Sequence, residues 1–210
     1  MLISVENIIK NRIANVLAEG LLSDLGFSVL PFAELAFLLH FGKENADGPI
    51  IDLQTLVKTF GGEFKFDKKS NDLNTAKKML HHSPDLIAVH PSGRTELIEV
   101  RYRANGQFIK GGKRVFALYP NSILLVISSG VTQEESASPA DQQFLASLRS
   151  TRFHIWRYDA KVETTNGTIT NPIPLSQWLI EEFKYDIVQV DRIVKEYEAY
   201  VTQWFSKAVK

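Results

Sequence analysis

The residues best suited to chemistry lie in two strand-like segments in the middle of the chain. The first reads Pro-Asp-Leu-Ile-Ala-Val from position 84, and the second reads Glu-Leu-Ile-Glu-Val-Arg-Tyr-Arg from position 96. Each apolar run carries an acid, Asp85 or Glu99, where a purely structural strand would carry another aliphatic residue. Two carboxylates gathered with the cation Arg101 at one end of a sheet form a natural site for a hard divalent metal ion. The pattern therefore indicates a metal-dependent catalytic site.

The turn between the two segments decides whether the acids can meet. Residues 90–94 read His-Pro-Ser-Gly-Arg, which is short enough to join neighbouring antiparallel strands. Pairing would bring Asp85, at the start of the first strand, close to Glu99, near the end of the second. Because side chains alternate between faces along a strand, Glu99 and Arg101 are expected to point the same way.

The rest of the chain predicts a mixed sheet flanked by helices. Residues 4–25 carry apolar residues at helical spacing, and Gly26 stands where a helix usually ends. Residues 123–128 are almost all apolar, as in a strand buried on both faces. The other expected elements are strands at 27–32, 84–90, 94–103 and 152–158, a hairpin about Asn166-Gly167, and helices at 33–41, 52–60, 72–82, 112–118, 139–149, 174–184 and 187–208.

This order predicts one α/β domain over residues 1–210, with helices on both faces of a mixed sheet. We expect the core to span about 4–158, and a hairpin and helical carboxy-terminal extension to span about 159–210. A chain of 210 residues with 44% hydrophobic and 23% charged residues is long enough to bury such a core.

Composition excludes several classes of chemistry. The chain has no cysteine, which removes disulfides, thiol catalysis and cysteine-based zinc sites. The first residues lack the basic flank and apolar run of a signal peptide, and no stretch of about 18 apolar residues could span a bilayer. We therefore expect a cytoplasmic protein without a membrane partner. The formal net charge is zero, so any attraction to nucleic acid must be local.

The acid pattern resembles that of the PD-(D/E)XK nuclease superfamily, the restriction-endonuclease-like proteins. Its motif is Pro-Asp, a spacer, then an acid, an apolar residue and a lysine. Here Pro84-Asp85 is followed after thirteen residues by Glu99-Val100-Arg101. The family also places a glutamate on its first helix, and Glu19 stands at that position in Ala-Glu-Gly-Leu-Leu. The resemblance implies a restriction-endonuclease-like fold and hydrolysis of phosphodiester bonds in nucleic acid.

The resemblance also implies a role for each residue of the motif. Asp85 and Glu99 would coordinate Mg²⁺ or Mn²⁺, and Glu19 would supply a further ligand directly or through water. Arg101 occupies the lysine position. A guanidinium stays protonated and cannot act as a base, although it can clamp a phosphate with two hydrogen bonds.

Three outcomes of the arginine substitution are open. Arg101 serves electrostatically and leaves water activation to the metal, or Lys110 or Lys113 reaches the site from the following segment. The third outcome is that catalysis has been lost while the scaffold persists.

A basic stretch after the motif points to the substrate. Residues 100–133 contain no acid. Beside Arg101, the basic residues of this stretch are Arg103, Lys110, Lys113 and Arg114. These are candidate contacts for nucleic-acid phosphates, and the resemblance favours DNA. The apolar residues near the carboxy-terminal end are expected to pack on the body of the protein or on a second subunit, namely Tyr197, Tyr200, Val201, Trp204 and Phe205. The resemblance, together with this candidate interface, implies a homodimer.

Each candidate also has a structural interpretation. Asp85 could cap a turn after Pro84, and Glu99 and Arg101 could form an exposed charge pair on a half-solvated sheet. Glu19 could lie on the solvated flank of an amphipathic helix. The rival functions are a catalytically inactive domain of the same fold that binds nucleic acid or a protein partner, and an interaction protein that never contacts nucleic acid.

Overall fold

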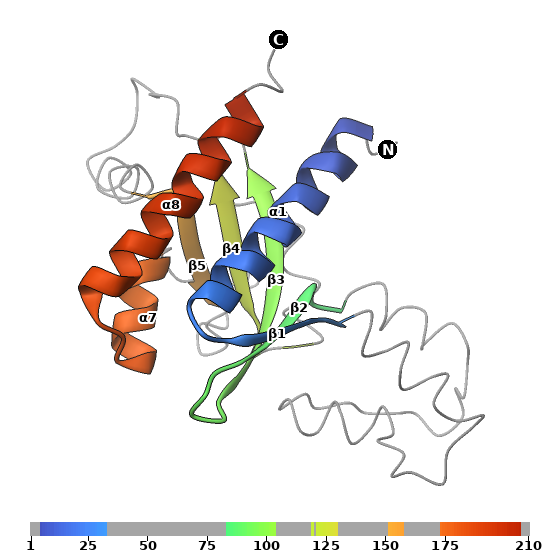
Figure 1. The fold of residues 1–210 in the computed structure, drawn as a ribbon. Coiled ribbons are helices and arrows are strands. Elements are labelled where there is room, and N and C mark those ends of the chain that lie inside the picture. The colour runs from blue at the N-terminus through green and yellow to red at the C-terminus, as the bar shows by residue number, and fades with distance from the viewer. Residues whose placement is uncertain are drawn as a thin grey trace, which may run out of the picture.

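A six-stranded mixed β-sheet forms the centre of the protein, with helices packed against it (Figure 1). The computed structural model describes residues 5–32, 83–103, 119, 121–129, 151–157 and 173–206. The elements in chain order are α1 (Val5–Asp24), β1 (Ser28–Pro31), β2 (Leu86–Val89), β3 (Thr95–Arg103), β4 (Ile123–Ser128), β5 (Phe153–Arg157), β6 (Ile173–Pro174), α7 (Leu175–Phe183) and α8 (Ile187–Ser206).

The strands lie side by side in the order in which they occur along the chain. β1, β2 and β3 are antiparallel neighbours, β3 and β4 run parallel, and β4, β5 and β6 are again antiparallel. β3 is the longest strand, with nine residues, and pairs with strands on both sides.

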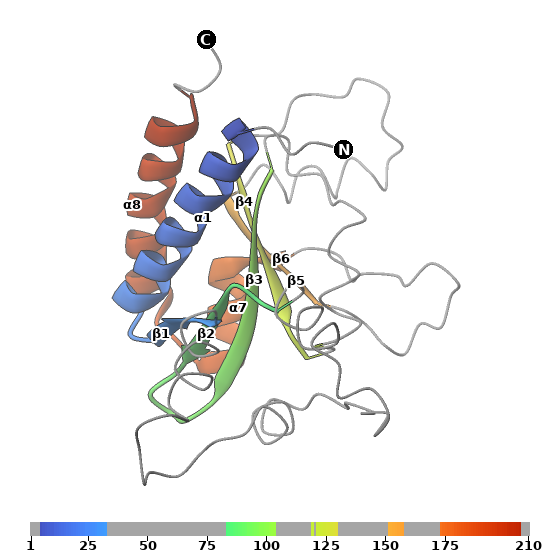
Figure 2. The same cartoon turned by 90° about the vertical axis from the view of Figure 1, so that its right-hand side faces the viewer.

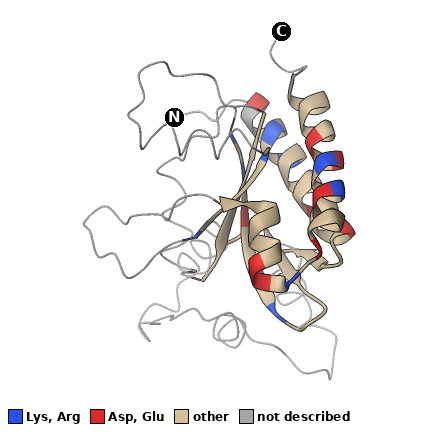
Figure 3. Cartoon of the chain, turned by 90° about the vertical axis from the view of Figure 1, so that its left-hand side faces the viewer, with Lys and Arg blue, Asp and Glu red and all other residues tan. Residues whose placement is uncertain are grey.

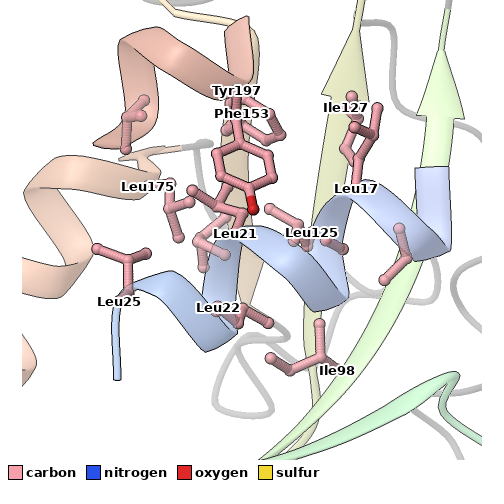
Figure 4. Close-up of a cluster of buried hydrophobic side chains, with 14 of the residues drawn as sticks. Leu17, Leu21, Leu22, Leu25, Ile98, Leu125, Ile127, Phe153, Leu175 and Tyr197 are labelled. Carbon is pink, nitrogen blue, oxygen red and sulfur yellow. The ribbon is translucent and has the colours of Figure 1, made fainter. Parts of the chain in front are cut away.

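One face of the sheet packs against α1, α7 and α8. Strand residues at every second position point to this face and join a single hydrophobic cluster with the helices, among them Ile98, Val100, Ile123, Leu125, Ile127, Phe153 and Ile155. Leu17, Leu21 and Leu22 of α1, and Leu25 directly after it, lie over the sheet in the same cluster (Figure 4). The one-turn spacing of the leucines puts them on a single side of α1, which explains why that side is buried.

The intervening strand residues point to the opposite face, and they are buried as well. They include Leu97, Glu99, Leu124, Val126, His154 and Trp156. The helices of the described residues all pack on the first face. The expected helices at 112–118 and 139–149, which would supply the second layer, fall outside the described residues. The architecture is therefore α/β, with a mixed sheet flanked by helices and a helix at its carboxy-terminal end.

Helix α1 is followed by a turn in which Gly26 adopts a left-handed backbone conformation. Gly26 has a φ of 90°, a left-handed conformation that costs glycine nothing. The Gly26 N–H donates to Ser23 O and the Phe27 N–H donates to Leu22 O, the two bonds of a Schellman motif. The turn at Gly26 directs the chain into β1 beneath the same helix.

Helix α8 runs beside α1 on the helical face of the sheet (Figure 2). The Tyr197 hydroxyl donates to Asp24 Oδ2 at 2.7 Å and lies against Gly20. Acidic and basic residues alternate along the exposed side of α8 (Figure 3). Tyr197, Val201 and Phe205 are buried, whereas Tyr200 and Trp204 are exposed. The carboxy-terminal apolar residues therefore divide between the core and the surface.

A charged network attaches α7 to the sheet. Glu182 of α7 forms ion pairs with Arg94 at 2.7 Å and Arg157 at 2.8 Å. Arg94 also pairs with the buried Glu96 at the start of β3, and burial raises the pKa of Glu96. Glu96 lies near the beginning of β3 and alternates with Ile98 and Val100 on the helix-facing side, whereas Glu99 and Arg101 point to the other side, so this network supports the sheet and does not belong to the candidate site.

The predicted elements within the described residues are confirmed to within a few residues at their ends. These are the first helix, the strands at 27–32, 84–90, 94–103, 123–128 and 152–158, and the two last helices. Strand β6 was not predicted. The expected helices at 33–41, 52–60 and 72–82 and the hairpin about Asn166-Gly167 lie outside the described residues. Within the described part of the chain, no helix combines the length and apolar character needed to cross a membrane.

Candidate functional site

The motif residues gather where β2 stops and β3 continues. β2 pairs with β3 only from Thr95 to Ile98, whereas β3 runs on to Arg103. From Ile98 onward the other side of β3 is paired with β4. Among the described residues, the β2 side of this part of β3 has no strand partner, and side chains bond to its backbone groups.

Asp85, immediately before β2, is fixed from several directions. Its Oδ2 accepts a 2.8 Å hydrogen bond from the Val100 backbone N–H, and its Oδ1 accepts a 3.3 Å bond from Nδ2 of Asn15 on α1. Its main-chain carbonyl accepts from the Phe32 N–H at 2.9 Å. The Asp85 carboxylate thus reaches across to the next strand, in contrast to a local turn cap after Pro84.

Glu99 is almost fully buried beside Asp85. Its side chain is 2% exposed, which rules out an exposed surface charge pair with Arg101. Burial, the neighbouring Asp85 charge and a hydrogen bond with Asp85 together raise the pKa of Glu99 to about 8, against the opposing charges of Arg101 and Arg103. We call Asp85 and Glu99 the acid pair, in which Glu99 binds a proton more tightly than an isolated glutamate does.

Arg101 contacts both members of the acid pair. Its Nη2 forms an ion pair with Glu99 Oε1, and its Nη1 lies 3.5 Å from Asp85 Oδ2. Nη1 also donates a 3.0 Å hydrogen bond to the carbonyl of Val100. The Val100 carbonyl and the two carboxylates thus hold the guanidinium at the edge of β3 beyond the end of the β2 pairing.

Arg103 extends the positive charge along the same face of β3. Its Nη1 donates to the carbonyl of Tyr102 at 2.9 Å, which repeats the backbone contact of Arg101 two residues earlier. Burial lowers the pKa of Arg103, the Arg101 charge lowers it further, and the Glu99 charge opposes both. Two arginines consequently stand in a row beside the acid pair.

Glu19 is not the residue through which α1 reaches the acid pair. It is half-buried on α1, and Asn15, one turn earlier, makes the contact with Asp85. In the part of the chain that the structure describes, no three His, Cys, Asp or Glu side chains gather closely enough to hold one metal ion. The structure therefore brings Asp85, Glu99, Arg101 and Arg103 together without Glu19. Lys110, Lys113 and Arg114 lie outside the described residues.

Sequence reasoning missed Asn15, although a signal for it exists. Residues four apart on a helix lie on the same side, so an expected inward-facing Glu19 makes Asn15 a candidate as well. Asn15 supplies an amide donor to the carboxylate, which holds Asp85 in one orientation without adding charge.

The acid pair has the donor chemistry that a magnesium ion requires. Mg²⁺ prefers hard oxygen ligands and commonly uses one or two protein carboxylates, with waters and substrate phosphates completing its shell. Asp85 and Glu99 supply two such carboxylates from adjacent strands. The two carboxylates therefore fit a magnesium ion, although Arg101 contacts oxygen atoms of both.

Comparison of the chain with protein-family models, curated protein sequences and solved structures found no significant match. Function therefore has to be inferred from the acid pair, the arginines beside it and the sheet that holds them.

Proposed function

We propose that this protein is a Mg²⁺-dependent nuclease with a restriction-endonuclease-like fold, which hydrolyses phosphodiester bonds of nucleic acid, with DNA as the favoured substrate. One observation carries the proposal. Asp85, immediately before β2, lies next to Glu99 on the neighbouring antiparallel strand β3, and Arg101 contacts both acids.

The order of elements around the site supports the proposal. An amino-terminal helix leads into β1, β2 follows Pro84-Asp85, and β3 carries Glu99-Val100-Arg101 beside the buried strand β4. The resemblance in sequence requires the motif to occupy consecutive strands in this order. The proximity of the two acids, with Arg101 in contact with both, supports the proposal.

The protein's own residues have separate tasks in this mechanism. Asp85 and Glu99 would hold the metal ion, which when bound polarises a phosphate and lowers the pKa of a bound water. Asn15 and the Val100 N–H hold the Asp85 carboxylate in place. Arg101 and Arg103 carry positive charge on the same face of β3, where they would stabilise the negative charge of a phosphate.

Cleavage assays with an isosteric variant test this function. Asp85→Asn removes the charge and keeps one acceptor oxygen, so we expect at least a hundredfold loss of Mg²⁺-dependent cleavage of plasmid or oligonucleotide DNA, the order expected when one essential electrostatic group is removed. Glu181→Gln, at an exposed position of α7, is the matched control and should leave cleavage unchanged. Equal cleavage by Asp85→Asn and the wild-type protein would contradict the nuclease proposal.

A catalytically inactive domain that binds nucleic acid or a protein partner is the second candidate. It is favoured by the structural use of the motif, because Asp85 satisfies a backbone N–H and Arg101 satisfies a backbone carbonyl at the edge of β3. DNA binding without cleavage in Mg²⁺ or Mn²⁺, measured by fluorescence anisotropy, would support this candidate. Failure to bind DNA or RNA at any salt concentration would instead indicate a protein that does not contact nucleic acid.

We also propose that the protein forms a homodimer through α8. The support is the exposure of Tyr200 and Trp204, since large aromatic side chains are enriched in protein interfaces.

A further inference from the structure

Arg101 already supplies a positive charge to the two acids that a metal ion would use. Its two terminal nitrogens are directed at Glu99 Oε1 and Asp85 Oδ2. A guanidinium remains protonated and presents its donors in a rigid fork, which suits two carboxylates at once. The bond from Nη1 to the Val100 carbonyl anchors the same side chain to the edge of β3.

The burial of the acid pair explains why such a cation is needed. The Glu99 side chain is 2% exposed, and that of Asp85 is 25% exposed. Moving carboxylates out of water is costly unless a positive charge or hydrogen-bond donors compensate. The Arg101 side chain, at 33% exposed, lies between the buried acid and solvent, so it can compensate the pair and also move away from it.

We propose that Arg101 is an internal cation that competes with divalent metal ions for Asp85 and Glu99, so that metal binding requires Arg101 to leave the acid pair. This inference rests on the proposed nuclease function and adds regulation to the same site. A phosphate group offers a guanidinium a bidentate partner of equal quality. An incoming nucleic-acid backbone would therefore draw Arg101 away and leave both acids to the metal, which couples metal binding to substrate binding.

Manganese binding to the full chain tests the competition directly. Arg101→Gln removes the charge and retains a planar polar group, and we expect it to bind Mn²⁺ at least about tenfold more tightly than the wild-type protein in calorimetric titrations. Arg103→Gln is the matched control. Arg103 lies on the same face of β3 and makes the same kind of backbone hydrogen bond, but it forms no ion pair with the acid pair among the described contacts. Its substitution should change the Mn²⁺ affinity by less than about threefold.

Thermal unfolding provides a second measurement that does not depend on activity. In a chelator, Arg101→Gln should unfold at a lower temperature than the wild-type protein, because the buried acids lose their compensating charge. Added Mn²⁺ should raise its unfolding temperature more than that of the wild-type protein. Arg101→Lys serves if the glutamine variant does not fold, since a single ammonium cannot contact both carboxylates as a fork does. Its Mn²⁺ affinity should also exceed that of the wild-type protein.

The results separate this inference from the proposed function. A folded Arg101→Gln or Arg101→Lys protein that binds Mn²⁺ no more tightly than the wild type would overturn the competition, as would an equal gain in Arg103→Gln. If the wild-type protein cleaves DNA in spite of such a result, the nuclease proposal stands alone. If Mn²⁺ binds more tightly to Arg101→Gln and no protein cleaves nucleic acid, the competition stands and the nuclease proposal fails.

Discussion

Glu99 combines three features that rarely occur in one acid: nearly complete burial, a second carboxylate beside it and an arginine in contact. Burial and the Asp85 charge outweigh the Arg101 charge, so the pKa of Glu99 rises to about 8. A proton is therefore part of the folded site near neutral pH. A metal ion that binds both acids would have to displace this proton as well as Arg101, so metal binding and proton release are linked.

This proton makes the stability of the fold depend on pH. Between the ordinary pKa of 4.5 and about 8, folded Glu99 holds a proton that the unfolded chain has released. Its contribution to stability is therefore complete below about 4.5 and is lost as the pH rises to about 8, with a slope of up to about 1.4 kcal/mol per pH unit. Urea denaturation at several pH values measures the slope.

Glu99→Gln, which resembles the protonated acid, should remove most of this slope. The remainder would come from Glu96, whose pKa is also raised by burial and which gives a slope of the same sign. Identical slopes in the variant and the wild-type protein would show that Glu99 is ionised in the folded state throughout this range.

Helices α1 and α8 are in close contact at Gly20 and Tyr197, where there is no room for a larger side chain. A Cβ atom built on Gly20 would lie 2.8 Å from the Tyr197 hydroxyl oxygen, closer than real Cβ contacts come. The ring cannot move freely, because its hydroxyl is bonded to Asp24 and the residue is buried. Glycine is retained in the helix at this position because it admits the tyrosine.

Gly20→Ala should therefore destabilise the protein. Alanine favours the helix by about 1 kcal/mol, but overpacking costs about 1–3 kcal/mol, so we expect a net loss of about 1 kcal/mol in chemical denaturation. In a Tyr197→Phe background the nearest atom is absent, and the same substitution should be neutral or stabilising. If Gly20→Ala lowers the free energy of unfolding equally in both backgrounds, its effect does not come from contact with the Tyr197 hydroxyl.

At the scale of elements, the strands were predictable and the orientation of the helix was not. The short turn between β2 and β3 determines their pairing, and alternation then puts Glu99 and Arg101 on one face, as found. The rotation of α1 about its axis depends on how its leucines pack on the sheet. For this reason the sequence indicated Glu19, whereas Asn15 makes the contact with Asp85.

Two further features of the sheet, the end of the β2–β3 pairing and the short strand β6, could not be predicted from the sequence. Residues after Ile98 lack a β2 partner, and this leaves backbone groups that Asp85, Arg101 and Arg103 satisfy. Strand ends are the least reliable part of any reading of sequence, because tertiary contacts decide where pairing stops. Strand β6, with two residues, is too short to leave a periodic signal at all.

For the whole molecule, a formal net charge of zero means that nucleic acid would be attracted only locally. Arg101 and Arg103 supply charge beside the acid pair, while acidic and basic residues alternate along α8 (Figure 3). The proposed surfaces for nucleic acid and for self-association therefore differ in chemistry, the first being charged and the second aromatic.

Self-association through α8 can be tested at its exposed tryptophan. Trp204 is 57% exposed, so Trp204→Ser should cost the monomer little stability and should shift a dimer towards monomer in light scattering at micromolar concentration. Val188→Ser, at the other end of the same helix and 72% exposed, is the matched control. A wild-type protein that is monomeric at these concentrations, or a dimer unaffected by Trp204→Ser, would exclude this interface.

The bond between Tyr197 and Asp24 joins residues 173 positions apart. Helix α1 is synthesised before its partner α8, so the surface of α1 that α8 covers stays uncovered while the chain between them is made. Contacts between such distant segments form late and slow the search for the native state. Helix α1, which also contacts Asp85 through Asn15, therefore gains its contacts with α8 only after α8 has been synthesised.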